Sequence, residues 1–103
     1  MSSLEVRLKF SQHIVVDAVD EDALLNLIRE DSDNLPPGLI ALRLLRFREK
    51  QGRYVIQADF DSRESADKSN DRPETQAWAK RLREMIEGDP KYENLDVVYE
   101  RHP

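Results

Sequence analysis

A chain of 103 residues has room for one domain with a modest core, so we interpret residues 1–103 as a single domain. The formal net charge is −5, and Lys and Arg form no long block of one sign, so no nucleic acid is expected as a partner. Cysteine is absent, which removes disulfides and thiolate chemistry, and no apolar run is long enough to span a bilayer. These observations predict a cytoplasmic protein without a membrane partner.

Alternating apolar and polar residues at the start of the chain predict one long strand from Leu4 to Val16, bent or bulged near Ser11 and Gln12. The positions that share the apolar parity are Leu4, Val6, Leu8, Phe10, Gln12, Ile14 and Val16.

A helix is expected directly after this strand, with Asp20 as its N-cap. Val19 and Leu24 have the spacing of a hydrophobic staple, and Leu24 and Leu27 lie on one helical stripe. The run Asp-Asn-Leu-Pro-Pro-Gly at 33–38 is the strongest breaker in the chain, so the helix ends before it.

The second strand, expected from Leu39 to Glu49, is apolar on both faces. One face carries Leu39, Ala41, Leu45 and Phe47, and the other carries Ile40, Leu42 and Leu44. Two apolar faces indicate burial on both sides of the sheet, and in so small a domain the second cover would be another subunit. Residues 49–52 then form a hairpin turn.

The third strand, from Arg53 to Asp61, alternates most clearly of all. Its apolar face consists of Tyr54, Ile56, Ala58 and Phe60, and its opposite face carries Val55, Gln57 and Asp59. Asp61 is expected to cap the next helix, with Glu64 returning a hydrogen bond to the cap amide.

Two further helices and a last strand complete the chain. The first helix runs from Ser62 to Asn70, and the run Asp-Arg-Pro-Glu at 71–74 begins a second one that reaches Glu87 and is ended by Gly88. The apolar stripe of the second helix is Ala77, Trp78, Leu82, Met85 and Ile86. Leu95, Val97 and Tyr99 alternate in a short final strand.

This order of elements predicts an α+β fold of the ferredoxin-like, split βαβ kind, with one four-stranded antiparallel sheet and helices on one face. The other face carries too many apolar residues to remain exposed, so we expect a homodimer that joins through the sheet faces.

Polar residues on that second face are candidates for chemistry. Gln57 and Asp59 project from it close to Arg43, either as a structural Arg–carboxylate pair or with Asp59 taking a proton from a substrate. His13 is the second candidate base, although a lone His of this kind is more often a surface or interface residue. The catalytic candidates are therefore Asp59 and His13.

Aromatic residues supply the candidate substrate pocket, which we expect to be bounded by Trp78, Phe47 and Tyr54, with Gln57 and Arg43 as further substrate-binding candidates. The sequence has no Gly-rich phosphate loop, no GxSxG and no HExxH, which argues against nucleotide binding, serine hydrolysis and zinc proteolysis. His13 and His102 lie too far apart in the sequence to make a case for a metal site, and we expect neither an organic cofactor nor a metal.

Two runs carry a resemblance to a known family. Asp-Phe-Asp-Ser-Arg-Glu-Ser-Ala at 59–66 and Ser-Asn-Asp-Arg-Pro-Glu-Thr-Gln-Ala-Trp at 69–78 resemble the antibiotic biosynthesis monooxygenase-like members of the dimeric α+β barrel superfamily. The resemblance implies a homodimer with sheets packed face to face and a pocket between sheet and helices or within the sheet layer. The family includes cofactor-independent oxygenases of aromatic polyketides, haem-degrading enzymes, isomerases and proteins of no known activity.

The haem-degrading branch fits this chain poorly. In that branch a Trp on this helix works with a His further along it and an Asn on the first strand, but here Gly88 follows Trp78 about three turns on. No Asn lies between Leu4 and Val16. Haem degradation is therefore not expected.

Two hypotheses for function remain. The first is a cofactor-independent monooxygenase that deprotonates a small aromatic or polyketide-like substrate, which then reacts with oxygen. The second is a non-catalytic homodimer that binds a small hydrophobic ligand or no ligand. A polar group without a structural partner in an apolar pocket wall would favour a ligand-binding or catalytic role.

Overall fold

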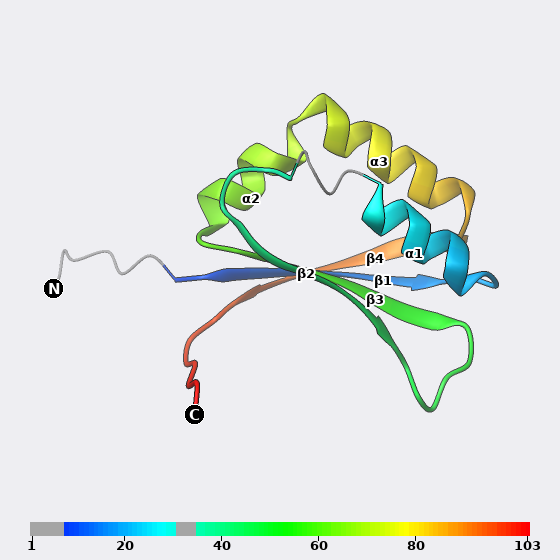
Figure 1. The fold of residues 1–103 in the computed structure, drawn as a ribbon, viewed down its shortest axis with the longest axis horizontal. Coiled ribbons are helices and arrows are strands. Elements are labelled where there is room, and N and C mark those ends of the chain that lie inside the picture. The colour runs from blue at the N-terminus through cyan, green and yellow to red at the C-terminus, as the bar shows by residue number, and fades with distance from the viewer. Residues whose placement is uncertain (1–7, 31–34) are drawn as a thin grey trace, which may run out of the picture.

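The computed structural model describes residues 8–30 and 35–103, which form one sheet with helices on a single side (Figure 1). The elements in chain order are β1 (Phe10–Asp17), α1 (Glu21–Arg29), β2 (Leu39–Arg46), β3 (Arg53–Phe60), α2 (Arg63–Asn70), α3 (Pro73–Glu84) and β4 (Glu87–Asp96). The strands lie in the order β2-β3-β1-β4, and each neighbouring pair is antiparallel. The predicted split βαβ fold is confirmed.

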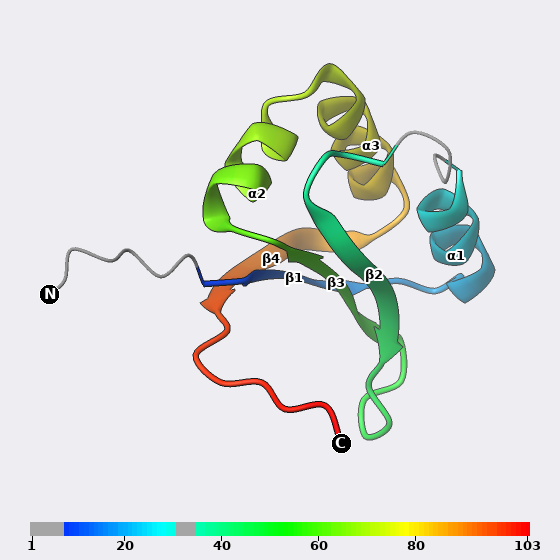
Figure 2. The same cartoon turned by 60° about the vertical axis from the view of Figure 1, so that its left-hand side comes forward.

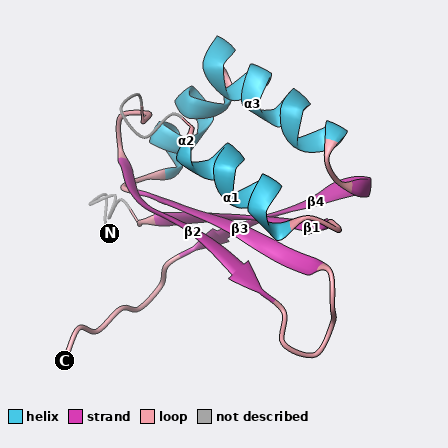
Figure 3. Cartoon of the chain, turned by 45° about the vertical axis from the view of Figure 1, so that its right-hand side comes forward, coloured by secondary structure: helices cyan, strands magenta, loops and turns pink. Residues whose placement is uncertain are grey.

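The helices α1, α2 and α3 cover one side of the sheet, which we call the helix face, and α1 and α3 lie alongside each other above it (Figures 2 and 3). The prediction for β3 is confirmed, because Tyr54, Ile56 and Phe60 are buried on this face. Leu24 and Leu27 of α1 and Leu82 of α3 pack onto it and are almost completely buried. The core therefore lies between the sheet and the helices.

The opposite side of the sheet, which we call the open face, has no helix over it (Figure 1). From the strand registers it is formed by Ser11, His13, Val15, Asp17, Ala41, Arg43, Leu45, Arg53, Val55, Gln57, Asp59, Lys91, Glu93 and Leu95. Leu45 and Leu95, on the two edge strands, are each 42% exposed. Large apolar side chains are thus left uncovered here, as the sequence predicted.

The first strand is shorter than predicted. It begins at Phe10, and residues 4–7 lie outside the described residues. Its register with β3 runs unbroken from Phe10 to Asp17, so the bulge expected near Ser11 and Gln12 is wrong. The irregularity lies instead between Val15 and Asp17, in the pairing with β4.

The face assignment of Leu39 in β2 is wrong because the strand is irregular at its start. Leu39 pairs with Phe60, whereas Ala41 pairs with Asp59, so Ile40 is an extra residue in the ladder. Leu39 consequently lies on the helix face, although simple alternation assigned it to the same face as Ala41. The strand also ends at Arg46, before the predicted end at Glu49.

The caps of the first two helices differ from prediction in detail. Asp20 caps α1 by accepting a hydrogen bond from the Ala23 amide at 3.1 Å, as predicted. Val19 is 87% exposed, so the predicted staple with Leu24 is not formed.

For α2 the cap is Ser62 and not Asp61, because the Ser62 hydroxyl oxygen accepts from the Ser65 amide at 3.2 Å. Asp61 has a supporting role, since its carboxylate accepts hydrogen bonds from the hydroxyls of Ser62 and Ser65.

The end of the chain is where the sequence interpretation fails most. The helix α3 ends at Glu84, not Glu87, and the last strand spans Glu87–Asp96 instead of starting near Leu95. Gly88 was expected to follow the end of the helix, but Gly88 and Pro90 both lie inside β4, where Gly88 has φ +71°. An edge strand tolerates both residues, because one side of its backbone needs no partner in the sheet.

Candidate functional site

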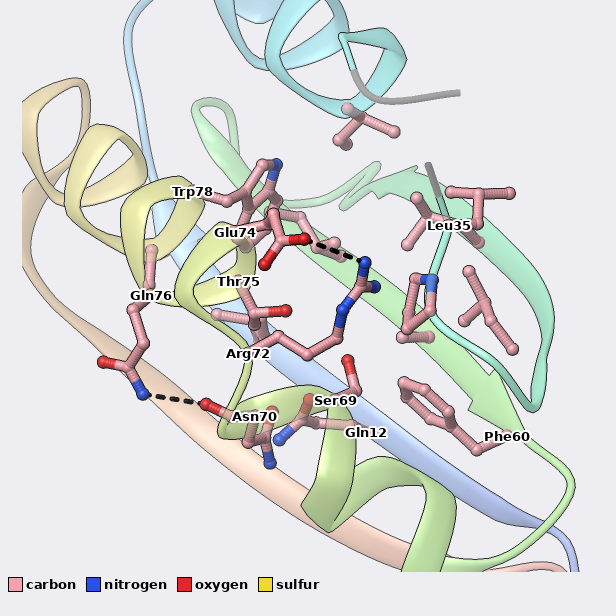
Figure 4. A pocket seen from close by; sticks show the side chains of 18 of the residues that line it. Gln12, Leu35, Phe60, Ser69, Asn70, Arg72, Glu74, Thr75, Gln76 and Trp78 are labelled. Atoms are coloured by element: carbon pink, nitrogen blue, oxygen red, sulfur yellow. Dashed lines mark hydrogen bonds and ion pairs between the residues drawn. The ribbon is translucent and has the colours of Figure 1, made fainter. Parts of the chain in front are cut away.

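A cavity of about 420 Å³ lies between the helix face of the sheet and the helices (Figure 4). Its floor is formed by side chains of all four strands, and its walls by α1, α3, the end of α2 and the segment from Leu35 to Leu39. Most of the lining is apolar, with Ile14, Ile56 and Phe60 in the floor. A cavity of this volume and character is suited to a small organic molecule.

Trp78 lines the cavity from α3, where the expected helical stripe places it. Its indole N–H donates to the backbone carbonyl of Leu27 at 3.3 Å, which ties α3 to α1 and fixes the ring. Trp78 is also the only tryptophan in the sequence. Its fluorescence therefore reports on the occupancy of this cavity.

Gln12 is a polar residue in the floor of this apolar space. It occupies the buried parity of β1, between Phe10 and Ile14, and it pairs across the strands with Ala58 and Asn94. Within residues 8–30 and 35–103, its side-chain amide takes part in no hydrogen bond. A polar group left without a partner in a mostly apolar wall calls for an explanation.

Ser69 at the end of α2 presents a second such group. The residue is only 5% exposed, and its hydroxyl makes no hydrogen bond within the part of the chain that the structure describes. Every fully enclosed side-chain nitrogen or oxygen among these residues does have a partner. The Gln12 amide and the Ser69 hydroxyl are therefore accessible, and both line the cavity.

An Arg–Glu ion pair lies at the junction of α2 and α3. The Arg72 guanidinium bonds to the Glu74 carboxylate at 3.3 Å, and their side chains are 21% and 47% exposed. Close by, the Gln76 side-chain amide donates to the Asn70 carbonyl at 2.8 Å (Figure 4). Glu74 is the one carboxylate among the described residues that line the cavity.

Asp59, predicted as a catalytic base, lies on the open face and is surrounded by donors. Its carboxylate accepts hydrogen bonds from the Ser11 hydroxyl at 2.7 Å, from Arg43 at 3.1 Å and from Gln57 at 3.2 Å. The predicted neighbourhood of Asp59 and Arg43 is confirmed. This side chain is engaged in an extensive structural network.

The network also sets the acidity of Asp59. Burial alone raises the pKa of this carboxyl, but the hydrogen bonds from Ser11, Gln57 and Arg43 outweigh it and lower the pKa below its ordinary value. A carboxylate with a lowered pKa is a weak proton acceptor. The geometry therefore favours the structural reading of Asp59 over the catalytic one.

The other predicted site residues are scattered. His13 lies on the open face between Gln57 and Glu93 in the strand register. Phe47 is 40% exposed beyond the end of β2. Neither residue lines the cavity beside Trp78.

Tyr54 is buried on the helix face near the start of α1, where burial and then the Glu21 carboxylate raise the pKa of its phenol. It does not line the cavity, so a single pocket bounded by Trp78, Phe47 and Tyr54 is wrong. The three aromatics lie on different elements, and alternation along a strand does not show how far along the sheet a cavity extends.

Sequence reasoning missed Gln12, Ser69 and Asn94. A signal for Gln12 was present, since it is the polar member of an otherwise apolar parity in β1. Ser69 and Asn94 gave no such signal, because a serine near a helix end and an asparagine in an edge strand are ordinary.

The described residues contain no group of three or more His, Asp or Glu side chains placed to hold a metal ion. Among the same residues, no helix has the length and apolar character that crossing a membrane requires.

The architecture and the cavity define the class of protein: a ferredoxin-like α+β chain with a small-molecule-sized space between its sheet and helices. No family model and no curated protein matches the sequence. Solved structures do match, and several of them are antibiotic biosynthesis monooxygenase-like proteins, in agreement with the resemblance of residues 59–66 and 69–78.

Three of these structures illustrate the likeness. A candidate antibiotic biosynthesis monooxygenase from Caulobacter crescentus CB15 superimposes with a TM-score of 0.73 at 18% identity, covering 90% of this chain and 92% of that one. A variant of SnoaB, a cofactor-independent oxygenase from Streptomyces nogalater, gives 0.72 at 15% identity, covering 89% and 95%. Rv0793 from Mycobacterium tuberculosis gives 0.74 at 14% identity, covering 91% and 99%. At these identities the likeness shows a shared fold.

Proposed function

We propose that the protein is a monooxygenase-like protein that takes a small aromatic or polyketide-like molecule into the cavity beside Trp78. The observation that carries the proposal is the pair of accessible, unpaired polar groups, Gln12 and Ser69, in an otherwise mostly apolar wall. The fold shared with SnoaB, a cofactor-independent oxygenase, supports oxygenation as the reaction.

The proposed reaction requires the protein to orient the substrate and to remove one proton from it. A substrate methylene that loses a proton becomes electron-rich enough to react with O₂, and the overall change converts CH₂ and O₂ into C=O and H₂O. The cavity would hold the rings, and the unpaired Gln12 amide would bind a substrate oxygen. Glu74 is the carboxylate within the lining that would accept the proton, and to do so it would have to turn away from the Arg72 guanidinium, 3.3 Å away. Asp59 and His13 would serve only a molecule bound on the open face.

The test uses the purified protein with anthrone- and hydroquinone-type compounds, measuring oxygen uptake and quenching of Trp78 fluorescence. Ala58→Leu fills the cavity floor and should abolish both binding and uptake, and Glu74→Gln should abolish uptake and leave binding. Ala77→Leu is the matched control, because Ala77, which was predicted on the apolar stripe of α3, is exposed and lies outside the lining. Oxygen uptake that survives Ala58→Leu would contradict the proposal, and binding without uptake would favour a non-catalytic binding protein.

We also propose that the protein is a homodimer joined through the open face. Leu45 and Leu95 are each 42% exposed there, and Val55 and Val15 continue the row of Leu45 across the sheet. Exposed apolar surface of this kind on a small domain usually marks an interface. The open face also carries the Arg43–Asp59 pair, which would lie within the interface. A stable contact of this kind buries on the order of 1,200 Å² or more.

Light scattering at micromolar concentration should give twice the chain mass of 12.0 kDa. Leu45→Glu places a charge on the open face and should give the monomer mass. Val19→Glu introduces the same charge at a position that is already 87% exposed and should leave the dimer intact. A wild-type monomer would rule out the dimer and leave the cavity proposal standing.

A further inference from the structure

The floor of the cavity is polar along one edge and apolar along the other. One row across the sheet, from β4 to β2, reads Asn94, Gln12, Ala58 and Leu42. All four line the cavity. Two side-chain amides therefore lie next to each other on β4 and β1, and a small and a branched apolar side chain continue the row on β3 and β2.

Ser69 belongs to the polar edge. Figure 4 shows Gln12, Ser69 and Asn70 gathered at one end of the cavity, with Trp78 and Leu35 toward the other. These three residues offer uncharged amides and a hydroxyl, and the Arg72–Glu74 ion pair lies next to them. They offer donors and acceptors side by side, so they suit a ligand group that both donates and accepts.

Building on the proposed function, we propose that Gln12 is the specificity-determining residue of the cavity. Its amide, beside Asn94 and Ser69, binds a hydroxyl of the ligand, and the ligand rings then lie over Ala58 and Leu42. A hydroxyl suits this edge because it can donate to the Gln12 carbonyl oxygen while it accepts from a neighbouring amide or hydroxyl.

The preference for a hydroxylated ligand over an apolar one arises because either ligand displaces water from the Gln12 amide. In the empty cavity, solvent can satisfy the Gln12 amide, since this group is accessible. A purely apolar ligand would remove that water and leave the amide unpaired, whereas a hydroxylated ligand replaces the lost hydrogen bonds. Sites built in this way discriminate strongly against a ligand that lacks the polar group.

The experiment compares 2-naphthol with 2-methylnaphthalene by isothermal titration calorimetry, because the two probes differ only by a hydroxyl in place of a methyl group. Wild type should bind 2-naphthol about ten- to a hundredfold more tightly. Gln12→Leu should lose this preference and bind 2-methylnaphthalene at least as tightly as wild type. Gln12→Met repeats the test with an unbranched side chain of similar length, and Gln51→Leu in the β2–β3 turn is the matched control.

The outcomes separate the two proposals. A preference for 2-naphthol that persists in both Gln12 variants, or equal affinities in wild type, overturns the role of Gln12 and leaves the cavity as a binding site. A preference lost equally in Gln51→Leu also overturns it. If wild type binds neither probe, the proposed function fails together with the inference.

Discussion

On the open face the Asp59 carboxylate accepts hydrogen bonds from three side chains, whereas on the helix face the Gln12 amide bonds to no described residue. Both are polar residues of central strands, and both are partly buried. The difference lies in what surrounds them. A polar side chain whose hydrogen-bond partners are all in the protein has a structural role. A polar side chain beside a cavity that has no partner in the protein can form hydrogen bonds with a ligand.

Other charged residues of the sheet also have partners within the protein. Arg53 bonds to Asp17 through two contacts at 2.9 and 3.3 Å. Near the edge of the sheet, Arg46 binds Glu21 in the same bidentate manner, which ties β2 to the start of α1. The charged residues thus pair with one another, and the cavity floor is left with neutral polar groups.

The largest expected effect concerns the core that supports the helix face. Phe60 is 3% exposed and packs with Phe10 and Ala66, so Phe60→Ala should lower the free energy of unfolding by about 3–5 kcal/mol. Urea denaturation measures the loss. Phe47→Ala is the control, because Phe47 is 40% exposed and should cost much less. Equal losses for the two variants would mean that the faces are assigned wrongly.

The next effect tests whether Asp59 is structural. Asp59→Asn removes the charge that Arg43 faces and leaves donors around it unsatisfied, so it should cost about 1–3 kcal/mol of stability. Asp89→Asn on the exposed edge strand is the matched control and should cost little. Because Asp59 does not line the cavity, binding of 2-naphthol should be unchanged. Lost binding with stability intact would instead place the functional site at Asp59.

Acid should lower the stability of the domain in part through the carboxylates of the open face. Hydrogen bonds from Arg53 lower the pKa of Asp17, and those to Asp59 outweigh its burial and lower its pKa as well. Folded pKa values below the unfolded ones mean that these groups contribute their stability above about pH 4 and lose it as the pH falls through the folded values. Urea unfolding between pH 7 and pH 3 should show this loss, with a smaller slope for Asp59→Asn. An identical slope in that variant would exclude Asp59 as a contributor.

The smallest effect compares one substitution on the two faces. Gln57→Leu breaks a hydrogen bond to Asp59 and should cost about 1 kcal/mol. Gln12→Leu breaks no hydrogen bond to a described residue, so the free energy of unfolding should stay within about 0.5 kcal/mol of wild type or rise. Thermal and urea unfolding compare them directly. A larger loss for Gln12→Leu would show that Gln12 has a structural role.

Much of the fold could be predicted from local patterns. Period-two alternation gave the faces of β3, and Asp20 gave the start of α1. The failures arose where tertiary pairing overrides local signals. The extra residue at Ile40 moved Leu39 to the other face, and β4 passed through Gly88 and Pro90 because it is an edge strand.

The candidate site could be predicted only in part. Trp78 was placed at a pocket wall from its helical stripe, and the contact between Asp59 and Arg43 followed from strand parity. Parity gives the face of a residue but not its hydrogen-bond partners. It could not show that Asp59 is satisfied by Ser11 and Gln57, nor that Gln12 has a cavity above it.

Ligand binding in the cavity can be tested directly by titrating ¹⁵N-labelled protein with 2-naphthol and following the titration by NMR. We expect the largest chemical-shift changes at the indole N–H of Trp78 and at the side-chain amides of Gln12 and Asn94, all of which line the cavity. The side-chain amide of Gln57 on the open face should not move. Chemical-shift changes centred on Gln57 and Arg43, with Trp78 unaffected, would rule out the cavity as the ligand site and place ligand binding on the open face.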